Sequence, residues 1–278
     1  MRSDLDYFNN EVEKKIININ DKSFKIYDSQ FNKDVIVFLP GSTGSGKVFF
    51  KYFFELKNDY RLISLDFPAY KKIDKFSCDL KKVLDELDIQ KFSLVSYSHS
   101  GIIAKYIFKK NISKVKNLFL LHSKTKTVEL NQNIVKAHYK NLNRTINKHK
   151  NVFKWLFRYS TKKAIKKGIL DSEVNEKDFY INFYTNLFKN TEIKDLNNIY
   201  YLLLDFWENK YFEKDDFKKF KGNVFIGEFE SEIKHLSDVQ KEVLRLFSNY
   251  KKVKFKSKPE MSLVTNFNKI ISIIKNNF

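Results

Sequence analysis

Cysteine is nearly absent from this chain of 278 residues, in which Cys78 is the only one. A single cysteine excludes an internal disulfide and fits a reducing compartment. Long hydrophobic runs are also missing, because the longest, such as VIVFLP at 35–40, are far too short to span a bilayer. The N-terminal residues 1–15 are charged and lack the apolar segment of a secretory signal. We therefore expect a soluble cytoplasmic protein.

Glycine and proline are scarce, with seven and three residues respectively. Where glycines cluster, as in GSTGSG at 41–46, the backbone is therefore expected to need them. Hydrophobic residues make up 42% of the chain and aromatic residues 16%, so a substantial core is available. The length suits one large α/β domain or a domain with an inserted lid.

Acidic residues are outnumbered by basic ones, and the net charge is +19. Such a charge suggests nucleic-acid binding. Lysine is nevertheless spread over nearly every segment, and no recognisable nucleic-acid module accompanies it. A general compositional bias explains the charge better, so we do not expect a nucleic-acid partner.

Apolar runs alternate with helical patterns in the first half of the chain. Residues 1–15 read as a polar lead-in, and an alternating hairpin follows at 15–20 and 23–29. Four continuous apolar runs, typical of strands buried on both faces, lie at 35–40, 60–68, 92–96 and 115–123. This alternation predicts a parallel sheet with helices on both faces.

Residues 124–220 interrupt the alternation with helical, aromatic-rich sequence. It resumes with a strand, a helix, a strand and a final helix, at 223–229, about Ser237–Phe247, 251–255 and about Ser262–Phe278. We therefore expect an α/β fold with a mostly parallel sheet of about eight strands and a helical lid inserted after the sixth strand. The core would comprise residues 1–123 and 221–278, and the lid residues 124–220.

The stretch FSLVSYSHSG at 92–101 changes from a strand pattern to a helical pattern with no flexible residue between them. Ser98 lies at the apex of the sharp turn that this requires, between the small residues Ser96 and Ser100. A serine held there exposes its hydroxyl, as a serine nucleophile requires. A strand-to-helix turn with a serine cap and no chemistry is the alternative.

The glycine-rich loop GSTGSGK at 41–47 allows two interpretations. It matches part of a nucleotide-binding phosphate loop, but Val48 replaces the Ser or Thr that holds Mg²⁺. Alternatively, the backbone N–H of Ser42 forms an oxyanion hole with the N–H of His99, the residue after Ser98. The second interpretation explains two motifs, whereas the first explains one.

Together these motifs resemble the α/β-hydrolase fold family over almost the full length of the chain. FLPGSTGS at 38–45 is similar to the family's oxyanion loop, and LVSYSHSG at 94–101 is similar to its Gly-x-Ser-x-Gly elbow, with serines in place of both glycines. Glu230, in FIGEFES at 225–231, takes the place of the catalytic acid. The resemblance implies hydrolysis of a carboxylic ester or thioester, or acyl transfer, through Ser98. It implies a small acyl substrate and no cofactor, and no residue cluster typical of a metal site is visible.

The family's catalytic histidine is replaced, because Pro259-Glu260-Met261-Ser262 stands where Gly-His-Met-Ser is common. In one hypothesis Glu260 is a buried base, with or without Glu230, because burial raises a carboxyl pKa. In a second, a histidine from elsewhere serves, and His122 is the best placed because it ends the strand beside the elbow. A strand-end histidine that is hydrogen-bonded to backbone is the alternative for His122. In a third, hydrolysis is lost, and the pocket binds a small apolar or acyl ligand or catalyses another reaction.

The remaining histidines are weaker candidates for the base. His99 is expected to point its ring away from Ser98. His235 reads as a solvated turn residue, and His138 and His149 lie in the expected lid, where exposure is the default.

The first part of the expected lid is strongly basic. Residues 124–167 contain 13 Lys or Arg against one acid, Glu129, and four of the basic residues recur at every fourth position from Lys136 to Lys148. Residues 168–220 contain 11 acids against seven bases, so the positive charge is local. The basic face could attract an anionic carrier or rest on an anionic membrane surface. A solvated helix face in a lysine-rich protein is the alternative.

Overall fold

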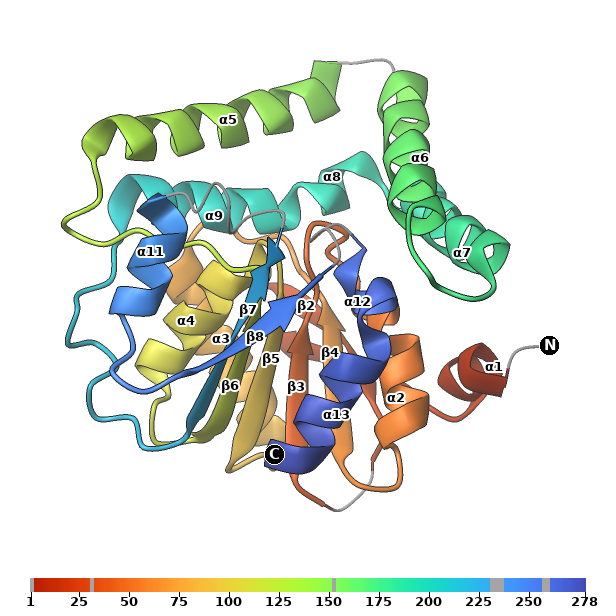
Figure 1. Cartoon of the computed structure of the whole chain (residues 1–278), viewed down its shortest axis with the longest axis horizontal. Helices are drawn as coiled ribbons and strands as arrows, with labels where there is room; N and C mark the ends of the chain where they lie inside the picture. The colour runs from red at the N-terminus through yellow and green to blue at the C-terminus, as the bar shows by residue number, and fades with distance from the viewer. Residues whose placement is uncertain (1–2, 31–32, 152–153, 231–237, 257–260) are drawn as a thin grey trace.

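An eight-stranded sheet crosses the molecule and carries helices on both faces, as Figure 1 shows for the computed structural model. The structure describes residues 3–30, 33–151, 154–230, 238–256 and 261–278. The strand order is β1-β2-β4-β3-β5-β6-β7-β8. Pairing is antiparallel from β1 through β2 to β4 and parallel across the rest of the sheet. The mostly parallel eight-stranded α/β fold expected from the sequence is confirmed.

The strands follow the apolar runs of the sequence closely. They are β1 (Glu13–Ile19), β2 (Lys22–Asp28), β3 (Val35–Leu39), β4 (Arg61–Asp66), β5 (Phe92–Tyr97), β6 (Val115–Leu121), β7 (Asn223–Phe229) and β8 (Lys251–Phe255). The inner strands β3 and β5 are buried along nearly all of their length, because helices cover both faces of the sheet there.

Helices on the two faces of the sheet build two separate apolar cores. One face carries α3 (Ile73–Glu86), α4 (Ser100–Lys110) and α11 (Asp238–Arg245). The other carries η1 (Gly46–Phe49), α2 (Phe50–Leu56), α12 (Ser262–Thr265) and α13 (Phe267–Asn277). The final helix expected from Ser262 is therefore two helices, which meet at Asn266.

The N-terminal segment differs from the expected polar lead-in, because it contains helix α1 (Ser3–Asn10). Phe8 is buried, and its ring packs edge-on against Phe53 of α2 at 5.2 Å. Tyr7 contacts Phe54 in the same way at 5.9 Å. The expectation was wrong because two aromatic residues in eight give a weak pattern, whereas α2 offers them an aromatic surface.

Residues 124–220, which we call the helical insertion, separate β6 from β7. They form α5 (Gln132–Asn151), α6 (Lys154–Leu170), α7 (Lys177–Asn190), α8 (Ile193–Leu196) and α9 (Asn198–Asn209). Helix α9 is part of the apolar core on the α3 and α4 face of the sheet, where Ile199, Leu202 and Phe206 are fully buried. Helix α5 lies across α9, and α6 and α7 pack as a pair beside them (Figure 1).

The carboxyl ends of β3 and β5 to β7 meet beneath the helical insertion (Figure 1). Ligand sites in parallel sheets lie at this edge. Within the described parts of the chain, no helix combines the length and apolarity needed to cross a membrane.

Candidate active site

The turn between β5 and α4 holds Ser98 in a strained conformation. Its φ is +56°, in the left-handed region that non-glycine residues rarely occupy. Two backbone hydrogen bonds fix the turn: the Ser98 N–H donates to the Leu121 carbonyl at 2.8 Å, and the Gly101 N–H donates to the Ser98 carbonyl at 3.0 Å. Backbone strain of this kind persists only where the surroundings impose it, and it clusters at functional sites.

The two serines that flank Ser98 in the elbow are accommodated by hydrogen bonds. Ser100 is fully buried, and its Oγ lies 2.9 Å from the carbonyl oxygens of both Leu39 and Tyr97. The same Oγ accepts a hydrogen bond from the Tyr97 N–H at 3.1 Å. Ser96 Oγ lies 3.4 Å from the Phe119 carbonyl oxygen. These hydroxyls tie the elbow to the neighbouring strands.

Gly101, at the start of α4, lies very close to Ser123, just after the end of β6. A Cβ at this position would lie 2.2 Å from Ser123 Oγ and 2.6 Å from Ser123 Cβ. A glycine is therefore required where α4 passes the end of β6.

His122 follows β6 directly and lies beside Ser98. Tyr97 pairs with Leu121 in the parallel register of β5 and β6, so Ser98 and His122 are the next residues on two strands about 4.8 Å apart. His122 also has a left-handed φ, +57°. Its ring packs edge-on against Phe229 at the end of β7, with centroids 5.8 Å apart.

The loop after β3 packs directly against the elbow. A Cβ on Gly41 would lie 3.1 Å from the Tyr97 carbonyl oxygen and 3.3 Å from Ser98 Cβ, so the loop backbone passes very close to the serine. Ser42, the next residue, lines a cavity together with Ser98. Tyr200 of α9 completes this corner, since its hydroxyl interacts with Ser42 and its ring lies 5.5 Å from the His99 ring. Burial raises the pKa of Tyr200 to about 12, so its phenol keeps its proton at neutral pH.

The carboxylate of Asp66 accepts hydrogen bonds from two donors of the glycine-rich loop. Ser45 Oγ donates to Asp66 Oδ1 at 2.7 Å, and the Gly46 N–H donates to the same oxygen at 2.9 Å. The Phe67 N–H donates to the Gly44 carbonyl at 2.8 Å. A nucleotide phosphate would have to displace Asp66, so the arrangement opposes the phosphate-loop interpretation.

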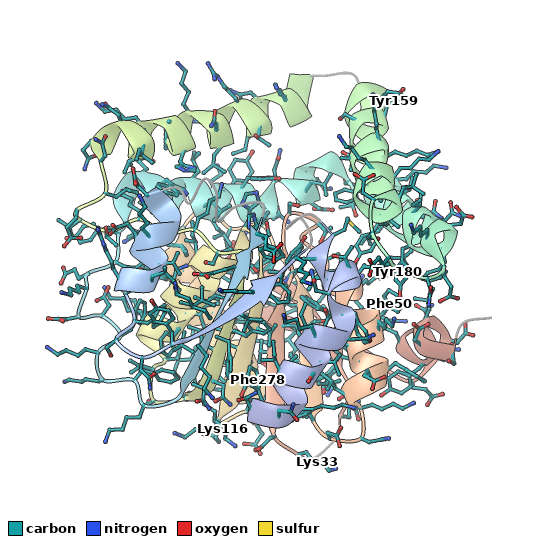
Figure 2. All side chains as sticks on the ribbon, viewed as in Figure 1. Lys33, Phe50, Lys116, Tyr159, Tyr180 and Phe278 are labelled. Atoms are coloured by element: carbon teal, nitrogen blue, oxygen red, sulfur yellow. The ribbon has the colours of Figure 1, made fainter. Side chains whose placement is uncertain are left out.

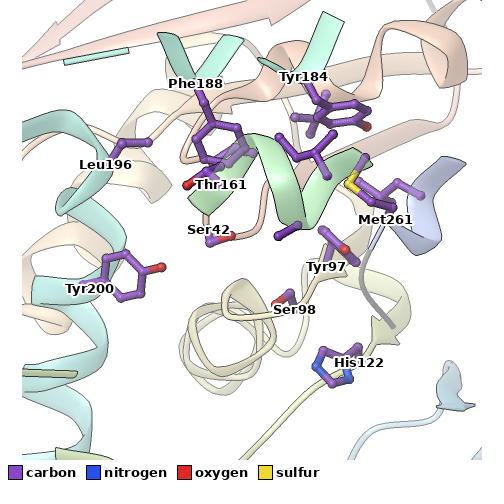
Figure 3. A pocket seen from close by; sticks show the side chains of 15 residues that line it. Ser42, Tyr97, Ser98, His122, Thr161, Tyr184, Phe188, Leu196, Tyr200 and Met261 are labelled. Carbon is purple, nitrogen blue, oxygen red and sulfur yellow. The ribbon is translucent and has the colours of Figure 1, made fainter. Parts of the chain in front are cut away.

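A cavity of about 300 Å³ opens above Ser98 and is walled by the helical insertion. Figure 3 shows Ser98 and His122 on one side of it and Tyr184 and Phe188 of α7 on the opposite side. Apolar side chains form much of its wall, including Val48, Ile165, Tyr184, Phe188, Leu196 and Met261. Its size is at the lower end for small-molecule sites, and its apolar lining suits a hydrocarbon group.

A second cavity, of about 60 Å³, is also lined by Ser98. Ser98 and His122 line it together with His99, Lys124 and His138. Trp207 and Leu203 of α9 and Leu142 of α5 close it. His138 stacks on Trp207, with ring centroids 4.5 Å apart.

Two histidines of the smaller cavity are held neutral. Burial, together with the smaller effect of the positive charge of Lys124, lowers the pKa of both His99 and His138 to about 4. Neutral imidazoles of this kind accept hydrogen bonds, so the smaller cavity suits water or another small hydroxylic molecule.

The buried amine of Lys105 anchors the segment after β6. It donates to Ser123 Oγ at 2.5 Å and to the Lys124 carbonyl at 2.7 Å, and its side chain is completely buried. Burial lowers the pKa of Lys105 well below its ordinary value. Lys105 thus fixes the two residues that follow His122.

The structure brings some of the predicted site residues together and leaves others apart. Ser98 and His122 line both cavities, whereas Ser42 lines the larger one and His99 the smaller one. Glu230, in contrast, is exposed at the end of β7 and is not among the described residues that line either cavity. Glu260 and His235 lie outside the described residues, and His149 lies on α5, where its side chain is not described.

Two residues of the site, His138 and Tyr200, were not predicted from the sequence. His138 is half-buried beside Ser98, although exposure was expected, because the pairing of α5 with α9 is long-range and leaves no local signal. Tyr200 lies in an aromatic run that reads equally well as core. Among the residues that the structure describes, His, Cys, Asp and Glu form no group of three or more that could hold a metal ion.

Comparisons with known proteins agree with this fold. A family model described as "alpha/beta hydrolase fold" matches residues 34–154. Maspardin from Danio rerio is 32% identical over 108 residues, which are 37% of this chain and 35% of the relative. Maspardin from Homo sapiens is 30% identical over 137 residues, 46% of this chain and 44% of the relative. The matched segment thus spans less than half of the length of these relatives.

Solved structures match over a much larger part of the chain. The enol-lactonase from Burkholderia xenovorans LB400 superimposes with a TM-score of 0.71 at 9% identity, covering 94% of this chain and 98% of that one. MenH from S. aureus gives a TM-score of 0.69 at 16% identity, covering 91% and 96%. At such identities the likeness concerns the fold alone.

Proposed function

Because the chain has the α/β-hydrolase fold, we propose that it hydrolyses a carboxylic ester or thioester, with Ser98 as the nucleophile and His122 as its general base. The observation that carries the proposal is the left-handed φ of Ser98 at the β5–α4 turn, where the serine faces both cavities. His122, the adjacent residue in register on β6, supports the choice of base.

The chemistry follows from these positions. His122 takes the hydroxyl proton as Ser98 Oγ attacks the acyl carbon, and the carbonyl electrons move to the oxygen. The N–H groups of Ser42 and His99 donate to this oxyanion. Collapse of the intermediate expels the alcohol or thiol, which takes the proton from His122. Water then attacks the acyl-serine and gives its proton to His122. His122 returns this proton to Ser98 Oγ as the carboxylic acid leaves, which regenerates the hydroxyl.

The two cavities suit different reactants. We assign the acyl chain to the larger cavity, because its wall is apolar. The smaller cavity, with its polar side chains and neutral imidazoles, suits the attacking water. Its volume of about 60 Å³ favours hydrolysis over transfer to a bulky alcohol. A cytoplasmic location, consistent with the single cysteine, belongs to this proposal.

A second candidate function is binding of an apolar or acyl ligand without hydrolysis. The observation that favours it is that Glu230, at the position where the fold family carries its acid, is exposed and is not among the described residues that line either cavity.

The test is steady-state turnover of an ester and thioester series from acetyl to lauroyl. We expect turnover that falls at least 100-fold in Ser98→Ala and in His122→Gln, since general base catalysis contributes about 10²–10⁴-fold. Ser113→Ala, on the loop before β6, is the matched control and should retain wild-type rates. Glu260→Gln tests the other base, and a loss there with wild-type rates in His122→Gln would refute the assignment. Tight binding of acyl ligands with no turnover would favour the second function.

A further inference from the structure

The outer side of helix α5 carries a row of basic residues. Lys136, Lys140, Arg144 and Lys148 are four residues apart, and all four side chains are exposed. Val135, Leu142 and Ile146 of the same helix are buried. At 100° per residue the buried and basic sets lie on opposite sides of the helix. The row therefore points away from α9 and from the sheet.

Helix α6, the next helix along the chain, also carries exposed basic residues, with exposed apolar side chains among them. Lys162, Lys163, Lys166 and Lys167 are exposed. Tyr159 is 65% exposed and Leu170 45% exposed. Positions 159, 163, 166 and 170 share one side of a helix, so Tyr159 and Leu170 flank two lysines in one stripe.

The opposite side of α6 forms part of the wall above Ser98. Thr161, Ala164 and Ile165 line the larger cavity. One helix thus separates the cavity from the basic surface, and whatever binds that surface lies within one helix diameter of the cavity.

The eight cations of α5 and α6 have no acidic partner among the residues that the structure describes. Several lysines elsewhere on the surface are paired with acidic residues, as in Lys114–Asp85 at 2.6 Å, Lys275–Glu55 at 3.1 Å and Lys252–Glu228 at 3.0 Å. The local excess of charge is thus uncompensated in three dimensions as well as in sequence.

We propose that this surface, formed by the outer sides of α5 and α6, docks the protein on a membrane containing anionic lipids. Basic residues near such a surface each contribute about 1 kcal/mol to binding. Exposed Tyr and Leu side chains within the basic stripe favour lipid over an acidic protein, because amphipathic and apolar groups enter the headgroup boundary. Docking would hold the apolar cavity next to lipid.

The experiment is sedimentation with vesicles of phosphatidylcholine alone or with one third phosphatidylglycerol. The test variant is Lys136→Gln/Lys140→Gln/Arg144→Gln/Lys148→Gln. Its control, Lys33→Gln/Lys91→Gln/Lys116→Gln/Lys251→Gln, removes the same charge from the amino-terminal edge of the parallel strands. Figure 2 shows Lys33 and Lys116 at the opposite end of the molecule from Tyr159. All eight substituted side chains are exposed, so folding should be retained and is checked by circular dichroism.

Wild-type protein and control should bind the phosphatidylglycerol vesicles and release them as salt is raised. The test variant, which lacks four basic residues, should lose about 600-fold in partition coefficient, given about fivefold per basic residue. Equal binding by test and control variants would overturn the proposal. Retention on a poly-glutamate resin with no vesicle binding would also overturn it and would favour an acidic protein partner. Both readouts are independent of turnover at Ser98.

Discussion

The left-handed φ of Ser98 predicts an unusual stability effect at the elbow. An L-residue in this conformation carries about 1–2 kcal/mol of strain that glycine lacks. Glycine in turn loses about 0.5–1 kcal/mol through the greater freedom of its unfolded chain. Ser98→Gly should therefore be more stable than Ser98→Ala by about 1 kcal/mol. Both variants lack the hydroxyl, so their difference isolates the backbone.

Ser272, exposed within α13, provides the matched control. Its helical backbone carries no such strain, so Ser272→Gly should be less stable than Ser272→Ala by about 1 kcal/mol. Urea unfolding measures both pairs, and with an m-value of about 3 kcal/mol/M each pair should differ by about 0.3 M in midpoint. Glycine being destabilising at both positions would refute the strained elbow and weaken the case for Ser98 as a nucleophile.

Four further predictions concern the surroundings of Ser98. Gly101→Ala should lower the free energy of unfolding by about 1–3 kcal/mol, because the added methyl group overpacks against Ser123. The double variant Gly101→Ala/Ser123→Gly should recover much of this loss. An unchanged urea midpoint in the single variant would contradict the close contact between Gly101 and Ser123. Because burial lowers the pKa of His99 and His138 to about 4, the unfolded chain binds more protons below about pH 6.5, so stability should be full above that pH and fall towards pH 4. In urea unfolding measured as a function of pH, His99→Asn/His138→Asn should lose less stability between about pH 6.5 and pH 4 than the wild type. An equal loss in both proteins would show that these two histidines do not cause the pH dependence. Lys105→Met should slow ester turnover more than Lys105→Arg by loosening the segment after His122, whereas equal rates in both variants and wild type would remove its positioning role. Asp66→Asn should destabilise the glycine-rich loop by about 1–3 kcal/mol without creating ATP binding, as followed by urea unfolding and calorimetric titration; tight ATP binding would revive the phosphate-loop interpretation.

The fold could be predicted from the sequence because its inner strands are continuous apolar runs. VIVFL of β3 and FSLVSY of β5 are buried nearly along their whole length. Continuous apolar runs of this length are typical of strands that are covered on both faces of a parallel sheet. Helix α1 was missed because its burial depends on the aromatic surface of α2, far from it in the printed sequence.

The site was only partly predictable for a similar reason. The elbow is a local feature, so Ser98 and the strand-end position of His122 could be read from neighbouring residues. His138 and Tyr200 reach the site through the packing of α5 and α9, which no local pattern encodes. The exposure of Glu230 likewise has no signal in the neighbouring sequence.

The central claim is that His122 activates Ser98. The rate of covalent labelling by a fluorophosphonate, with the modified peptide identified by mass spectrometry, tests it most directly. We predict modification at Ser98, a rate at least 100-fold lower in His122→Gln, and a rate within threefold of wild type in Glu260→Gln, following the usual contribution of a general base. An unmodified Ser98, or equal labelling of wild type and His122→Gln, would contradict the account.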